Sequence, residues 1–277
     1  MGRADRRIML KQAMAEVSRG GLNLRANQGD QSWAVIGATR ILIDMLSGHS
    51  PTRASKAAEW AHQFFETSLK KNATEVKVAC AQGCAFCCYY AVSALAPEVF
   101  LVANAVRAQH PHDFDSAQAR IRAVEQITRG LNGLQRAQKR IACAFLVDNL
   151  CTVYSARPSP CRGMSSVSVK ICERGFKGES VGIPTPQVWT SLRSAELQAM
   201  WAALTAVDLP SDSYELNEAV SVALEQPNAE ARWLKGEDIF ARVNRMRIDS
   251  PEILEHNKKI IANLVAGAMG KEIPNQG

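Results

Sequence analysis

Eight cysteines, all between positions 80 and 172, constrain this chain of 277 residues more than any other feature. Residues 1–79 and 173–277 contain no cysteine. Thiols that merely fill a hydrophobic core would be spread along the chain, so this segregation indicates ligands for a metal ion or an iron–sulfur cluster. We therefore expect all eight to be metal ligands: Cys80, Cys84, Cys87 and Cys88 in a first burst, then Cys143, Cys151, Cys161 and Cys172.

Disulfide bonds are the competing explanation, and they depend on the cellular compartment. The N-terminal sequence MGRADRRIMLKQAMAEV is interrupted by charges and lacks the apolar region of a secretory signal. No apolar run approaches the length needed to span a bilayer. We therefore expect a cytoplasmic protein without a membrane segment, and in that reducing compartment clustered cysteines more often bind metal than form disulfides.

The spacing within the first burst is typical of metal ligands. Cys80 and Cys84, and then Cys84 and Cys87, are close enough for a tight turn to direct two thiolates at one ion. Cys87 and Cys88 cannot both follow that geometry, because adjacent side chains diverge; one of them turns to a second metal, to a redox role or into the core. Eight thiolates suit two four-coordinate centres or one centre with spare thiols, and the spacing leaves both open.

Charge adds a further expectation about the site. A metal bound by four thiolates keeps net negative charge, which nearby cations stabilise. Arg157 and Arg162 lie close to Cys161 and are held there by flanking prolines, so we expect both to stabilise the bound centre. The basic run at 135–140 is expected to be a solvated helix face. Glu98 is expected either to orient a ligand or to favour a helix start. The net charge of +6 is mild, so nucleic acid is not expected as a partner.

The remaining sequence predicts a mainly α-helical protein with a small β-hairpin, stapled around the cysteine-ligated centre. Three parts are expected: a helical region at 1–72, a cysteine-cluster domain at 73–180 and a second helical region at 181–277. The predicted helices cover 33–46, 54–69 after a start at Ser50-Pro51, 97–106, 113–140, 186–209, 214–224, 228–234 and a segment beginning at Ser250-Pro251. Residues 29–32 are predicted to be a loop, 143–154 a hairpin whose arms carry Cys143 and Cys151, and 157–163 a rigid turn.

The cysteine segment resembles a known family. Gly83-Cys84-Ala-Phe-Cys87-Cys88, followed by Val92 and Pro97-Glu98, resembles the first half of the YkgJ-type cysteine-cluster family. Cys143-Ala-Phe-Leu, Cys151-Thr-Val-Tyr154 and Arg157-Pro-Ser-Pro-Cys161-Arg162-Gly163 resemble its second half, and Cys172 falls where its last cysteine is expected. The resemblance covers residues 80–172 and implies zinc, iron or iron–sulfur binding without implying a particular reaction.

Three functions follow from these observations. The first is an iron–sulfur protein, with a four-iron cluster, that has a redox role. The second is a zinc-chelating structural module whose flanking helical regions bind a partner protein. The third is a metal-dependent protein-modifying enzyme, because the flagellin lysine N-methylases carry a related cysteine cluster. Vicinal cysteines and eight thiolates exceed what one structural zinc needs, so iron is ranked above zinc. No phosphate loop, dinucleotide fingerprint or nucleophile elbow is present.

Overall fold

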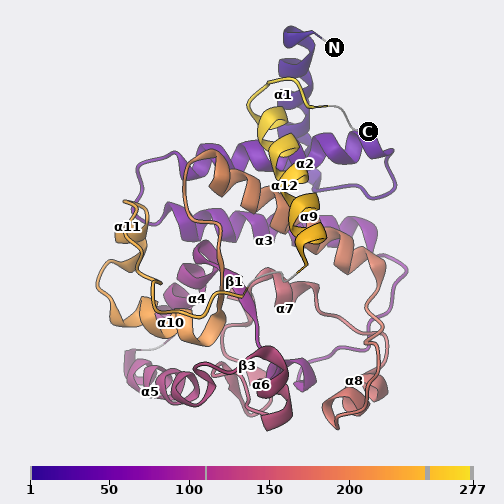
Figure 1. Cartoon of the computed structure of the whole chain (residues 1–277). Helices are drawn as coiled ribbons and strands as arrows, with labels where there is room; N and C mark the ends of the chain where they lie inside the picture. The colour runs from indigo at the N-terminus through magenta and orange to yellow at the C-terminus, as the bar shows by residue number, and fades with distance from the viewer. Residues whose placement is uncertain (1, 110, 247–249, 275–277) are drawn as a thin grey trace. The chain divides into compact units, whose positions relative to one another are not determined.

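The computed structural model describes residues 2–109, 111–246 and 250–274. It is mainly helical and contains two small antiparallel sheets, which confirms the expected fold class (Figure 1). None of the described helices is long and apolar enough to cross a membrane. Contacts divide the chain into two compact units, one drawn from residues 1–75, 190–211 and 247–277, the other from 76–189 and 212–246. All eight cysteines lie in the second unit, together with residues 212–246 of the C-terminal third.

The first unit is built from helices that cross closely at small residues. At Gly37 an added Cβ would lie 2.8 Å from the backbone carbon of Ala13, and at Gly267 it would lie 2.8 Å from Cδ1 of Ile36. Glycine therefore lets these helices approach one another. The helices are α1 (Arg3–Gly20), α2 (Gln28–Leu46), α3 (Arg53–Asn72), most of α9 (Gln187–Ala206) and α12 (Pro251–Ala268).

Two helix starts in the first unit differ from the prediction. Residues 29–32 are helical, not a loop, because Asn27 caps α2 by accepting the backbone N–H of Asp30 at 2.9 Å. Helix α3 begins at Arg53, whereas Ser50 belongs to the preceding turn and accepts the N–H of Thr52 at 3.3 Å. The start of the last helix at Ser250-Pro251 is confirmed, with Ser250 as its N-cap.

The second unit combines short helices with two two-stranded sheets. Strand β1 pairs antiparallel with β4, with Ala94 opposite Tyr214, and each strand leads directly into a helix. The predicted helix at 214–224 therefore begins only at Leu216. The elements are η1 (Phe86–Tyr89), β1 (Ser93–Leu95), α4 (Ala96–Ala108), α5 (Pro111–Thr128), α6 (Gly133–Lys139), β2 (Leu146–Val147), β3 (Leu150–Cys151), η2 (Tyr154–Ala156), α7 (Ser159–Gly163), α8 (Val169–Phe176), β4 (Ser213–Glu215), α10 (Leu216–Glu225) and α11 (Ala229–Trp233).

An aromatic core fixes the sheet and its helices. The Phe100 ring centroid lies 5.6 Å from those of Trp233 and Phe240, and Tyr214 lies 4.7 Å from Phe240. All four side chains are almost fully buried. Residues from the middle and the C-terminal third of the sequence therefore share one core.

Three local predictions around the cysteines need correction. The single helix expected at 113–140 is two helices, α5 and α6, separated by a break at Gly130, whose φ is +76°. The rigid turn expected at 157–163 contains the short helix α7. The hairpin is confirmed, with positive φ at both Asp148 and Asn149 as a two-residue I′ turn requires. Its arms are shorter than predicted, however, and Cys143 precedes β2 instead of lying in it.

Candidate metal centre

The eight cysteines reach the second unit from several separate pieces of backbone. All are free thiols, and Cys80 and Cys87 are exposed whereas the others are half-buried. Cys80 and Cys84 lie in an irregular segment before η1, Cys87 and Cys88 in η1, Cys143 before β2, Cys151 in β3, Cys161 in α7 and Cys172 in α8.

Cys84 is the centre of a first group of thiols. Its pKa is raised above the ordinary value chiefly by burial, and the charges of Cys80, Cys87 and Cys172 raise it further. Cys172 therefore acts electrostatically on the first burst although it lies far along the chain. These four thiols form the first group.

Aromatic packing explains how Cys172 reaches that burst. The ring of Phe176, at the end of α8, lies 4.8 Å from the ring of Tyr89 and 5.7 Å from that of Phe86. The guanidinium of Arg140 lies 5.1 Å from the centroid of the Phe176 ring. Helix α8 is thereby held against η1, which carries the vicinal cysteines.

A second group contains Cys143, Cys151 and Cys161. Burial is the main cause that raises the pKa of each of these thiols, to about 12 in Cys143. The charges of Cys143, Cys87 and Cys151 raise the pKa of Cys161 further. Cys87 therefore interacts with both groups.

The vicinal pair joins the two groups. A hydrogen bond with Cys88 raises the pKa of the Cys87 thiol, and desolvation of the sulfur adds to the effect although the residue as a whole is exposed. The carbonyl oxygen of Cys88 accepts the backbone N–H of Cys143 at 2.7 Å. The structure therefore links the first burst to Cys143 through the main chain, and all eight cysteines lie in the second unit.

The two predicted arginines have different surroundings. The charge of Arg157 lowers the pKa of Cys87, Cys151 and Cys161, opposing the larger effects of burial and thiol repulsion. Its guanidinium also lies 3.7 Å from the centroid of the Tyr154 ring. Arg162 donates from Nε to the carbonyl oxygen of Arg157 at 2.8 Å, so it holds the backbone of the residue whose charge acts on the thiols.

The thiols of the described residues do not form a complete coordination sphere for one metal ion. Within the described part of the chain, no three His, Cys, Asp or Glu side chains are grouped closely enough to hold one ion. The donor chemistry nevertheless fits a zinc or iron centre. All eight cysteines of this unit are free, and thiolates are ligands that both zinc and iron accept.

Backbone contacts anchor the segments that carry the outer cysteines. The Sγ of Cys80 accepts the N–H of Ser166 at 3.2 Å, and the carbonyl of Ser166 accepts the N–H of Ala79 at 2.7 Å. Glu98 accepts the N–H of Ser159 at 2.6 Å and so holds the start of α7, which carries Cys161. Glu98 also accepts the backbone N–H of Leu95 at its own helix start, as its expected role in favouring that start requires.

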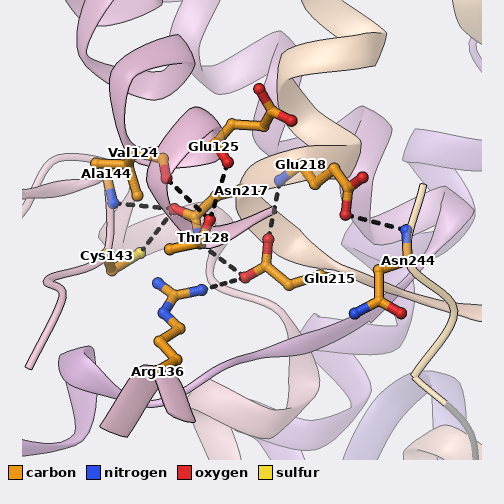
Figure 2. A network of polar contacts seen from close by, with 10 residues as sticks. All are labelled: Val124, Glu125, Thr128, Arg136, Cys143, Ala144, Glu215, Asn217, Glu218 and Asn244. Atoms are coloured by element: carbon orange, nitrogen blue, oxygen red, sulfur yellow. Dashed lines mark hydrogen bonds and ion pairs between the residues drawn. The ribbon is translucent and has the colours of Figure 1, made fainter. Parts of the chain in front are cut away.

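A buried polar network holds Cys143, and it was not predicted from the sequence. Asn217 Oδ1 accepts the N–H of Ala144 at 2.9 Å and lies 3.6 Å from the Sγ of Cys143. Asn217 Nδ2 donates to Glu215 at 2.9 Å, and Glu215 forms an ion pair with Arg136 (Figure 2). The only sequence signal was a polar triplet at the start of α10, which resembles any helix N-terminus.

Comparison with known proteins agrees with this geometry. Residues 79–180 match the model of the CxxCxxCC family, described as "Putative zinc- or iron-chelating domain". The match confirms the family resemblance of the cysteine segment and supports metal binding by it. No curated protein and no solved structure matches the chain significantly. The chain is thus mainly helical, and its residues 79–180 match a domain family to which zinc or iron chelation is ascribed.

Proposed function

We propose that the cysteine set binds an iron–sulfur cluster and that the protein has a redox role. The observation that supports the proposal is that eight free cysteines lie in one unit, where the N–H of Cys143 donates to the carbonyl oxygen of Cys88 at 2.7 Å and so links the first burst to the later cysteines. A structural zinc needs only four ligands, fewer than the eight thiols present. Cysteine thiolates are also the usual ligands of iron–sulfur clusters.

The surroundings of the thiols support an anionic centre. Arg157 provides positive charge beside Cys87, Cys151 and Cys161. We propose that Arg157 stabilises the bound centre and that Arg162 fixes the backbone of Arg157. A cluster would supply one-electron transfer, with a potential set by the nearby charges and hydrogen bonds. A reducing cytoplasm would keep the thiols available for it.

Protein purified without oxygen tests the proposal. Iron, acid-labile sulfide and zinc are measured per chain together with a visible absorption spectrum. Iron with matching sulfide and a broad visible absorption that bleaches on reduction is the expected result. Stoichiometric zinc without iron, sulfide or visible absorption would overturn the cluster and favour a zinc-chelating structural module.

Reconstitution provides a second, independent readout. The metal-free chain is incubated with ferrous iron, sulfide and a thiol reductant, and the same uptake is attempted with Cys84→Ser. Because Cys84 interacts with three other thiols, the variant is expected to lose the cluster. Equal iron and sulfide in the two proteins would remove Cys84 from the ligand set.

A further inference from the structure

Arg136 is buried where the sequence pattern indicated a solvated charge. It lies in α6 within the basic run at 135–140, yet only 1% of the residue is exposed. Its Nη1 donates to Oε1 of Glu215 in β4. Removing a guanidinium from water costs free energy that one ion pair recovers only when the remaining donors also find partners. The environment of these remaining donors is therefore informative.

Two nitrogen atoms of this guanidinium have spare hydrogen-bonding capacity. Nε and Nη2 of Arg136 are buried and find no hydrogen-bond partner among the described residues. An arginine has five N–H donors, and buried donors are normally paired. The two unpaired nitrogens of Arg136 thus indicate an acceptor that joins them in another state of the protein.

Cys143 is the nearby group whose charge depends on metal binding. Figure 2 shows Arg136 joined to Glu215, and Glu215 joined to Asn217, which contacts Cys143. Asn217 completes the connection, because it bonds to Glu215 at 2.9 Å and lies 3.6 Å from the sulfur of Cys143.

We propose that Arg136 is the positioning residue for the Cys143 side of the metal centre, where its spare N–H groups stabilise the thiolate of Cys143 once a metal is bound. The proposal rests on the metal binding proposed above and extends it to a residue outside the cysteine motifs. Glu215 keeps the guanidinium charged and oriented, while Asn217 fixes the backbone of Ala144 beside the thiol. Arg136 is thus assigned to Cys143, whereas Arg157 acts on Cys87, Cys151 and Cys161.

Zinc affinity, measured by competition with a chromogenic chelator, tests this role without needing any activity. The variant is Arg136→Met combined with Glu215→Gln, which removes both buried charges together. Loss of a residue that supports a ligand typically weakens metal binding about 10–100-fold, and a loss in that range is expected. Zinc affinity equal to that of the unaltered chain would overturn the proposal.

A conservative variant and a surface control separate this role from general folding. Arg136→Lys keeps the positive charge for Glu215 but has fewer donors, so a smaller loss of zinc affinity is expected with unchanged stability of the metal-free chain. If the double variant does not fold, Arg136→Lys alone tests the proposal. Zinc affinity of Arg136→Lys equal to that of the unaltered chain would then overturn it. Arg122→Met removes an exposed pair with Glu225 and should leave affinity unchanged. Failure of the unaltered chain to bind zinc or iron would instead contradict the proposed function.

Discussion

The backbone N–H of Cys143 donates a 2.7 Å hydrogen bond to the carbonyl oxygen of Cys88. This bond joins the first burst of cysteines to the later four through the main chain. Cys143 is also held from the other side by Asn217. The approach of the two cysteine groups is therefore a property of the folded chain and does not depend on a metal as the sole link between them.

Replacing Cys84 should accordingly remove the metal while leaving the fold. We expect Cys84→Ser to bind no iron or zinc, because Cys84 interacts with three other thiols. Its far-ultraviolet circular dichroism and thermal midpoint should match those of the metal-free parent chain. Cys88→Ser is the matched comparison and should lose less metal if Cys88 is the spare thiol of the vicinal pair. Full metal content in Cys84→Ser would contradict this assignment.

The charge of Arg157 should set the reduction potential of a bound cluster. Arg157 interacts with Cys87, Cys151 and Cys161, so its removal takes positive charge from beside the thiolates. Because reduction adds negative charge, Arg157→Ala should lower the potential, by on the order of tens of millivolts for a partly screened charge. The measurement is a spectroscopic redox titration.

Two further variants control the Arg157 measurement. Arg157→Lys should recover much of the potential, since the charge is kept. Lys170→Ala removes an exposed positive charge of the same region and should have little effect. A potential that is equal in Arg157→Ala and the parent chain would exclude Arg157 from this role.

Metal-free protein should lose stability as the pH rises above 9. Burial raises the pKa of Cys143 from its ordinary value of 9.0 to about 12, so the folded chain keeps a thiol proton that the unfolded chain releases. The contribution of the protonated Cys143 thiol to the free energy of unfolding is complete below pH 9 and is lost between pH 9 and 12. The free energy of unfolding lost in this way amounts to about 1 kcal/mol between pH 9 and 10. Denaturant unfolding at several pH values measures it.

Cys143→Ser provides the control for the pH dependence. Serine does not titrate in this range, and its hydroxyl can still reach Asn217. The difference in unfolding free energy between the parent chain and the variant should therefore narrow or change sign as the pH rises. A difference that stays constant from pH 8 to pH 10.5 would show that the Cys143 thiol does not titrate in this way.

Loss of Asn217 should destabilise the chain strongly for a single amide. Its side chain satisfies the N–H of Ala144 and a carboxylate oxygen of Glu215, and it is fully buried. Asn217→Ala leaves the N–H of Ala144 without this partner and removes one of the two donors to Oε1 of Glu215, which costs about 1–3 kcal/mol. Asn244→Ala is the control, because Asn244 is exposed and contributes its backbone N–H to Glu218. Equal effects of the two substitutions on denaturant midpoints would contradict the importance of the network.

The sequence predicted those features that depend on local chemistry. Ser250-Pro251 begins a helix because its capping group and fixed φ act within one turn. Asp148-Asn149 forms the hairpin because both residues tolerate positive φ. The family motif likewise covers a continuous segment, so its match to residues 79–180 could be expected from the cysteine spacing.

Features that depend on distant partners were missed. Strands β1 and β4 have three residues each, and nothing in Ser93-Ala94-Leu95 shows that it pairs with residues 213–215. Arg136 has the sequence surroundings of a surface charge, and only its ion pair with Glu215 explains its burial. Gly130 is present in the sequence, but a glycine inside an amphipathic pattern can either be tolerated within a helix or end it. The sequence alone therefore did not predict the break between α5 and α6.

The network around Cys143 also has a consequence for the order in which the chain is made. All eight cysteines are synthesised before Glu215 and Asn217, because Glu215 follows Cys172 by 43 residues. That length takes a few seconds to translate at about 5–20 residues per second. During this interval the nascent chain displays its thiols without the carboxylate and amide that later fix Cys143. The complete environment of that thiol can form only after the start of α10 has emerged.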